Sequence, residues 1–80
     1  MNDLLMYIVK SIVNKPDDVK TEEETTNDSV NLKLTVGKDD MGITIGKSGQ
    51  TIRAIRKLLI ARAMAENKNL RVDLELVEDK

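Results

Sequence analysis

Two segments in which apolar and polar residues alternate, 30–36 and 70–77, lie on either side of a long stretch with helical periodicity. Their apolar positions are Val30, Leu32, Leu34 and Val36 in the first segment and Leu70, Val72, Leu74 and Leu76 in the second. Alternation with a period of two predicts half-buried strands. Because the stretch between them is long enough for a crossover, the strands are expected to lie parallel with a right-handed connection. No other feature of the chain constrains the fold as strongly.

The residues before the first of these strands predict a helix and a hairpin. Apolar residues recur every three or four positions in 2–14, which predicts an N-terminal helix that ends before Pro16. The acidic segment 19–26 contains a single apolar residue and is interpreted as a weak edge strand or a loop. As a strand it would pair antiparallel with 30–36 through a turn at 27–29.

Two helices are expected between the alternating segments. A short one at 41–45 can be capped by Asp39 or Asp40, and a long uninterrupted one covers 50–66 before residues 67–69 end it. The predicted order is α-β-β-α-α-β, an α+β fold in which three helices pack on one face of a three-stranded mixed sheet. The 80 residues form one domain, and such a small domain buries only about 60% of its unfolded surface.

The composition excludes several classes of function. The chain has no cysteine and no histidine, which removes thiol nucleophiles, imidazole bases and the usual zinc ligands. Its carboxylates and lysines are scattered, so we expect a non-enzymatic protein without metal or cofactor. No segment approaches the roughly 18 apolar residues of a membrane span, and the first residues do not resemble a signal peptide. A cytoplasmic protein without membrane association is therefore expected.

Opposite charges are segregated along the chain, although the formal net charge is only -1. Residues 17–28 hold six acidic residues and one lysine, whereas residues 47–62 hold five basic residues and no acidic one. A compact basic face can bind a few phosphates even in a chain of this net charge. Because Tyr7 is the only aromatic residue, such binding cannot depend on a platform of stacked rings.

The motif Gly46-Lys47-Ser48-Gly49 connects the two central helices. Two glycines allow a sharp turn and a close approach to a sugar-phosphate backbone, and the N–H groups that start the next helix favour phosphate oxygens. Lys47 adds a cation and Ser48 a hydroxyl donor. The alternative is that the glycines only form a tight corner between helices. A Walker A loop is disfavoured, because three residues rather than four separate Gly42 from Gly46.

A longer motif surrounds this loop. It reads Asp40-Met41-Gly42-x-x-Ile45-Gly46-Lys47-x-Gly49-x-x-Ile52 and continues with Ala54-Ile55-Arg56. In these residues the chain resembles the KH domain family, and specifically the small bacterial KH proteins of the KhpA type, over nearly its whole length. The acidic segment 20–26 departs from the family pattern, because it lacks apolar alternation.

The resemblance implies a type II KH domain with a groove that holds about four nucleotides of single-stranded RNA without aromatic stacking. It implies a role as an RNA chaperone or post-transcriptional regulator, and relatives are linked to cell shape and cell division. Single-stranded DNA is the alternative ligand.

Carried over by position, the resemblance assigns RNA binding to nine residues. They are Gly46, Lys47, Ser48 and Gly49 in the loop, the groove residues Ile43, Ile45 and Ile52, and Arg53 and Lys57 on the long helix. The alternative for the isoleucines is core packing, and the alternative for the two basic residues is a solvated helix face. Arg56 lies nearer the buried side and is expected to pair with an acidic residue.

The long helix has more apolar residues than one buried stripe requires. One stripe, suited to covering the sheet, is formed by Ile52, Ile55, Leu59 and Ala63. A second stripe is formed by Ala54, Leu58, Ala61 and Ala65, while Ile60 and Met64 lie elsewhere on the helix. The excess either packs under the N-terminal helix or forms a subunit contact, for which the candidates are Leu58, Ala61, Ala65, Ile60 and Met64.

The resemblance implies a homodimer, and also pairing with a larger KH protein of the KhpB or Jag type. The alternative function is accordingly a protein-interaction subunit with little RNA binding of its own.

Overall fold

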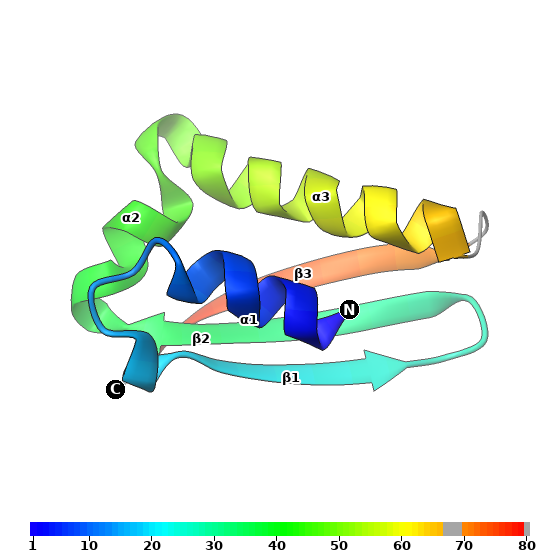
Figure 1. The fold of residues 1–80 in the computed structure, drawn as a ribbon, viewed down its shortest axis with the longest axis horizontal. Helices are drawn as coiled ribbons and strands as arrows, with labels where there is room; N and C mark the ends of the chain where they lie inside the picture. Colours follow the sequence, from blue (N-terminus) through cyan, green and yellow to red (C-terminus); the bar gives the residue numbers. More distant parts are fainter. Residues whose placement is uncertain (67–69, 80) are drawn as a thin grey trace.

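A three-stranded sheet with helices on one face is formed by the residues that the computed structural model describes, 1–66 and 70–79 (Figure 1). In chain order the helices and strands are α1 (Asn2–Lys10), β1 (Lys20–Thr25), β2 (Ser29–Gly37), α2 (Met41–Ile45), α3 (Gln50–Glu66) and β3 (Arg71–Asp79). Single turns of 3₁₀ helix lie at Pro16–Asp18, Lys38–Asp40 and Lys47–Gly49. The α+β class and the mixed sheet with three helices are confirmed.

The central strand of the sheet is β2. It pairs antiparallel with β1 and parallel with β3, and α2 and α3 form the crossover between β2 and β3. The segment that was expected as a weak strand or a loop is a regular strand, because every residue of β1 pairs with β2, from Lys20 opposite Thr35 to Thr25 opposite Val30. Nearly all of its side chains are exposed, so this strand depends on backbone pairing rather than on apolar burial.

Consecutive glutamates of β1 point to opposite faces of the sheet, as expected for a strand. Glu23 faces α1 and accepts the backbone N–H of Asn2 at 2.9 Å, with the amino group of Met1 at 3.9 Å. Glu22 and Glu24 pair with Lys33 and Asn31 on the face without helices. This accounts for a strand whose sequence shows no apolar alternation.

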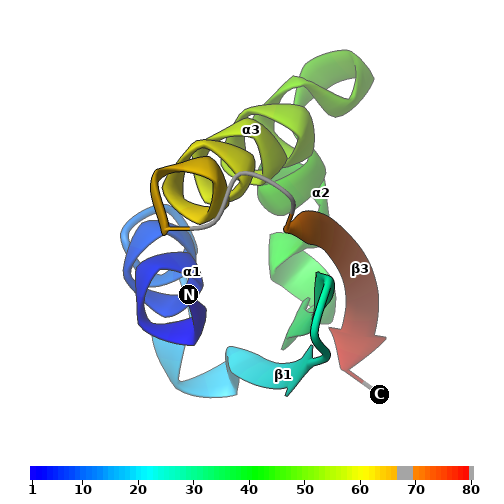
Figure 2. The ribbon, with the colours of Figure 1, turned by 90° about the vertical axis from the view of Figure 1, so that its right-hand side faces the viewer.

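The core lies between the sheet and the two longer helices, which lie next to each other over one face of the sheet (Figure 2). Its members are Leu5 and Val9 of α1, Val19, Val30, Leu32, Leu34 and Val36 of the hairpin region, Ile55, Leu59 and Ala63 of α3, and Val72 of β3. The apolar positions of β2 and the predicted α3 stripe from Ile55 onward are thus buried. Each large side chain buried here contributes about 1.5–3 kcal/mol.

The N-terminal helix is shorter than predicted, because α1 ends at Lys10 and not at residue 14. Beyond it the backbone tightens: the N–H of Ile12 donates to the carbonyl of Val9 at 3.1 Å, three residues back, as is common in a last helical turn. Ile12 and Val13 still pack, half-buried, against the core. Apolar periodicity therefore continues past the end of the helix.

The last strand also differs from its predicted range of 70–77, because β3 begins at Arg71 and runs to Asp79. It extends further because its last three residues pair with the last three of β2. The predicted end of the long helix at 67–69 lies outside the described residues.

The second apolar stripe of α3 does not pack under α1, which was one of its two interpretations. Its alanines are exposed, and Leu58 is 54% exposed. Met64 is 55% exposed, whereas Ile60 is half-buried and packs against the core. The stripe stays uncovered because it lies on another side of α3 than Ile55, Leu59 and Ala63, which face the core.

Candidate nucleic-acid interface

The turn between α2 and α3, residues 46–49, has a backbone conformation that few residues adopt. Gly46 has φ 78° and ψ 173°, Ser48 has φ 55° and Gly49 has φ 76°. The N–H of Gly49 donates to the carbonyl of Gly46 at 3.1 Å, which closes the turn. Positive φ costs glycine nothing, so the two glycines make this sharp connection possible.

Gly46 is required by its surroundings as well as by its backbone angles. A Cβ at this position would lie 2.8 Å from the backbone nitrogen of Thr51, closer than real Cβ atoms approach other atoms. Its angles also belong to a region that is essentially restricted to glycine. The loop therefore folds back tightly on the first turn of α3.

Ser48 is the only residue other than glycine with a positive φ among residues 1–66 and 70–79. The left-handed conformation costs such a residue about 1–2 kcal/mol. Lys47 and Ser48 are both exposed, so they project from a turn that is fixed by the glycines on either side. A strained polar residue of this kind is typical of a binding loop.

The basic residues of α3 begin directly after the loop. A Cβ on Gly49 would lie 3.6 Å from Nη1 of Arg53, so the guanidinium lies beside the turn. Lys57, one helical turn further, is exposed. Arg56 is exposed as well, and no ion pair among the described residues includes it, contrary to the expectation that it pairs with an acidic residue.

Three isoleucines near the loop are less covered than the core residues. Ile43 is 45% exposed, Ile45 is 36% exposed and Ile52 is half-buried. The alternative interpretation was that these isoleucines pack in the core, which requires them to be buried. It is wrong for Ile43 and Ile45, the two isoleucines of α2, because both are exposed. They present apolar surface next to the basic residues.

The short helix α2 is not capped by an aspartate side chain, contrary to expectation. The carboxylate of Asp40 turns instead to the segment after α1, where it accepts the backbone N–H groups of Asn14 at 3.0 Å and Lys15 at 2.9 Å. No local pattern could have signalled this role, because its partners lie 26 and 25 residues earlier in the chain. Asp39 is exposed and accepts a hydrogen bond from Nζ of Lys15 at 3.0 Å, which together with the charge of Asp39 raises the pKa of Lys15 above its ordinary value.

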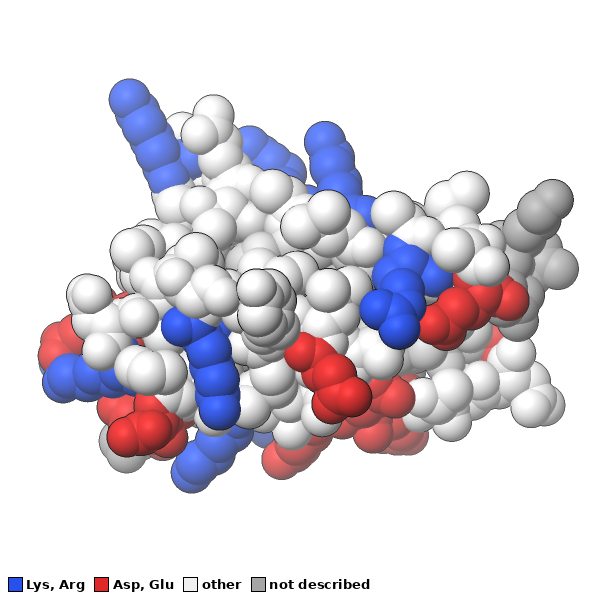
Figure 3. Space-filling view, in the orientation of Figure 1, with Lys and Arg blue, Asp and Glu red and all other residues white. Residues whose placement is uncertain are grey.

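The charges of the folded chain are separated in space as they are in the sequence. In Figure 3 basic side chains project from the side of the molecule that carries the loop and α3, while most acidic side chains lie toward the β1 side of the sheet, with further basic side chains among them. The exception on α3 is Arg62, whose Nε lies 3.0 Å from Oε1 of Glu66. The loop end of α3 is therefore a basic surface that no acidic side chain interrupts in this view.

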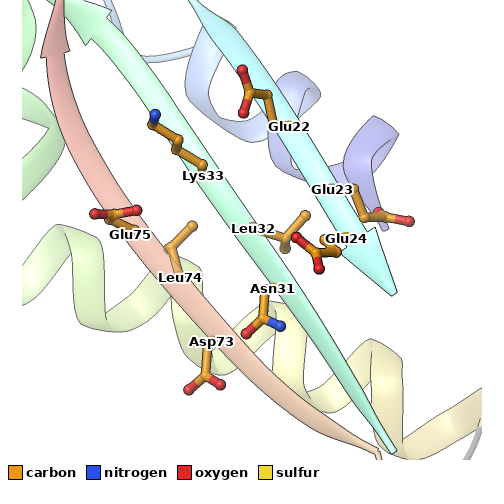
Figure 4. Close-up of a pocket in the computed structure, with 9 residues that line it drawn as sticks. All are labelled: Glu22, Glu23, Glu24, Asn31, Leu32, Lys33, Asp73, Leu74 and Glu75. Carbon is orange, nitrogen blue, oxygen red and sulfur yellow. The ribbon is translucent and has the colours of Figure 1, made fainter. Parts of the chain in front are cut away.

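The sheet face without helices has the opposite character. Figure 4 shows a pocket of this face, about 390 Å³ in volume, whose lining residues are Glu22, Glu23, Glu24, Asn31, Leu32, Lys33, Asp73, Leu74 and Glu75, although the side chain of Glu23 points to α1 and that of Leu32 to the core. Carboxylates from β1 and β3 lie on both sides of Lys33 of β2. A surface with this excess of negative charge repels phosphates, so it is not a candidate site for a nucleic acid.

Within residues 1–66 and 70–79, no helix has the length and apolar character needed to cross a bilayer. The same residues contain no group of three or more acidic side chains arranged to hold a metal ion.

A family model described as KhpA/KhpB, KH domain, matches residues 2–74. Three relatives, each named RNA-binding protein KhpA, are similar over nearly their full length. The chain is 44% identical to that of Chlamydia caviae over 80 residues, which covers both chains completely. It is 42% identical to that of Listeria monocytogenes over 78 residues, covering 98% of this chain and all of the relative. It is 42% identical to that of Clostridium perfringens over 74 residues, covering 92% and 99%.

Proposed function

The chain belongs to the KhpA/KhpB family of KH domains, and from this premise we propose that it binds single-stranded RNA through the loop 46–49 and the first turns of α3. The relatives bear the name RNA-binding protein. The observation that carries the proposal is the loop itself, which presents Lys47 and Ser48 at the head of a 17-residue helix whose first turn contains no acidic residue.

The RNA backbone is bound where the chain offers donors and no side-chain obstruction. Gly46 and Gly49 have no Cβ, so a phosphate can approach the main chain closely. The N-terminus of α3 is the positive end of the helix dipole, which favours a phosphate oxygen, although the N–H of Gln50 itself donates to the Lys47 carbonyl. Lys47 and Arg53 supply mobile cations on either side of the turn, and Lys57 extends the basic surface along α3.

The bases contact apolar surface rather than aromatic rings. Ile43 and Ile45 are partly exposed next to the loop, and Ile52 is half-buried at the start of α3. KH domains bind unstacked bases of single strands beside the GxxG loop. Base contacts to these isoleucines would recover the apolar burial that the free chain leaves incomplete.

We assign the chain a non-enzymatic role as an RNA chaperone or post-transcriptional regulator in the cytoplasm, with residues 1–80 acting as one KH domain. A footprint of a few phosphates gives weak binding, which suits a protein that associates with many transcripts briefly. The links to cell shape and cell division implied by the family stay predictions.

The test is a salt titration of binding to a short labelled single-stranded RNA. It compares the native chain with the variant Lys47→Asp/Ser48→Asp. Each phosphate contact contributes about 0.7 to the slope of log K against log salt for a single strand. The native chain is expected to bind with a slope of a few contacts, and the variant is expected to bind at least about tenfold more weakly, a loss of ~1.4 kcal/mol.

The chain contains a matched control, since Lys10 and Ser11 form the same dipeptide and are also exposed. Lys10→Asp/Ser11→Asp changes the net charge by the same amount and should retain most of the RNA affinity. Circular dichroism establishes that all three proteins are folded. Equal losses in both variants would mean that net charge alone governs binding, which contradicts the proposal. A DNA strand of the same sequence tests whether the 2′-hydroxyl contributes.

A second function is favoured by the uncovered stripe of α3. Ala54, Leu58, Ala61 and Ala65 form an exposed apolar surface, and small residues permit the close approach of another helix. The chain would then act chiefly as an interaction subunit, as a homodimer or with a larger KH protein of the KhpB or Jag type. In that case Lys47→Asp/Ser48→Asp would change little.

A further inference from the structure

Asp40 is a fully buried carboxylate that plays no direct part in the proposed contacts with RNA. Its exposed fraction is 0%, and among the described residues only Thr44 is another polar residue that is buried. Its two oxygens accept the N–H groups of Asn14 and Lys15 at 3.0 and 2.9 Å. Burying a carboxylate is costly unless hydrogen bonds satisfy it, so these two bonds fix its position firmly.

The helix that Asp40 precedes is short and contacts the core through Met41. α2 contains five residues, and a helix of this length is not stable by itself. Ile43 and Ile45 are partly exposed, so they contribute less packing than core residues do. Within the helix, Oγ1 of Thr44 donates to the Asp40 carbonyl four residues back at 2.7 Å.

This arrangement links the start of α2 to the chain that follows α1, and the end of α2 to the loop. The N–H of Gly46 donates to the carbonyl of Gly42 at 2.9 Å, so the first loop residue continues directly from the helix. Any displacement of α2 is therefore passed to the loop. A shift there would move the N–H groups and Lys47 relative to one another.

We propose that Asp40 is a positioning residue for RNA binding: its buried carboxylate anchors α2 to residues 14–15 and thereby holds the loop 46–49 in the geometry that binds phosphate. The inference rests on the proposed function. It predicts that removing the charge of Asp40 weakens RNA binding. Electrostatics alone predicts the opposite, because removing an acidic residue near a phosphate-binding site normally strengthens binding.

Asp39 provides a matched comparison. Asp39→Asn and Asp40→Asn remove the same charge from adjacent positions with no change in side-chain size. Asp39 is exposed and bonded only to the Lys15 side chain, whereas the amide of Asp40→Asn would point an N–H₂ group at one of the two backbone donors. Thr44→Val is a second comparison, because it removes a hydrogen bond within α2 and leaves both bonds of the Asp40 carboxylate in place.

The experiment measures RNA affinity at several salt concentrations, at a temperature where circular dichroism shows each variant to be folded. Asp40→Asn is expected to weaken binding about tenfold and to lower the salt slope by about 0.7, the value of one phosphate contact. Asp39→Asn should bind as well as the native chain or better. Hydrogen exchange should accelerate at Gly46 and Gly49 but not at Leu5 and Val9, whereas a general loss of stability would accelerate all four.

Native affinity, slope and exchange in folded Asp40→Asn would overturn the inference and leave the proposed function intact. If Asp40→Asn does not fold, Asp40→Ser decides, because it removes the carboxylate without adding volume: a loss of about threefold with faster exchange at Gly46 supports the anchor, and native behaviour overturns it. Failure of the native chain to bind RNA overturns the proposed function, and the inference with it.

Discussion

At the turn between α2 and α3 the main chain itself restricts which residues can occupy each position. Gly46 combines a conformation available only to glycine with a close approach to Thr51, whereas a Cβ on Gly42 would meet no atom within 4 Å. Ser48 has a left-handed backbone at an energetic cost. The energetic cost at Ser48 and the restriction to glycine at position 46 thus both fall in the loop proposed to contact phosphate.

Alanine substitutions at the two glycines should have opposite effects on stability. Gly46→Ala is expected to lower the free energy of unfolding by about 1–3 kcal/mol, because it forces a residue with a Cβ into a glycine-only conformation. Gly42→Ala is expected to raise it by about 0.5–1 kcal/mol, because alanine is the better helix former. Urea denaturation measures both. Native stability for Gly46→Ala would contradict the geometry described for the loop.

Among the secondary-structure elements, those with a strong local pattern could be predicted from the sequence. Alternation predicted β2 and β3 as strands, and periodicity predicted the stripe of α3 that is buried from Ile55 onward. The local pattern could not predict β1 as a strand, because β1 depends on pairing with β2. It could not predict where α1 ends either, because apolar residues that pack against the core continue beyond the helix.

The candidate site divides in the same way. The loop could be predicted because its glycines and Lys47 lie within four residues, and the second apolar stripe of α3 because it has a helical period, but whether that stripe is exposed or covered by the N-terminal helix could not. The role of Asp40 could not, because the Asn14 and Lys15 groups that it binds are distant in sequence and belong to the backbone. Because every residue except proline has a backbone N–H, the residue types at 14 and 15 do not indicate that these groups bind Asp40.

The uncovered stripe of α3 leads to a prediction about association. Leu58→Asp should convert a dimer at tens of micromolar into a monomer, because it places a charge at the centre of the proposed contact. The stability of the monomer should change by less than about 0.5 kcal/mol, since Leu58 is 54% exposed. Light scattering measures the mass of the native chain and of the variant in solution. Tyr7→Asp is the control, because Tyr7 is a large residue on α1 that is even more exposed, at 75%. A native chain that is already a monomer would contradict the dimer.

On the scale of the whole molecule, the separation of charge explains how a chain of net charge -1 can bind a polyanion. The Cα atoms extend over 35 × 22 × 17 Å, and even the shortest dimension exceeds the Debye length of about 8 Å at physiological ionic strength. The acidic sheet face is therefore expected to oppose RNA binding only weakly at the proposed loop site, and to confine the nucleic acid to one side of the protein.

The most direct test of this account is an NMR titration of the uniformly ¹⁵N-labelled native chain with a short single-stranded RNA. The largest amide shift changes are expected at residues 46–49 and in the first turn of α3, with little change at Asn31, Lys33 and Asp73 on the acidic sheet face. Shift changes centred on that face or on the Leu58 stripe, with the loop unaffected, would contradict the central claim that this KH domain binds RNA through its GxxG loop.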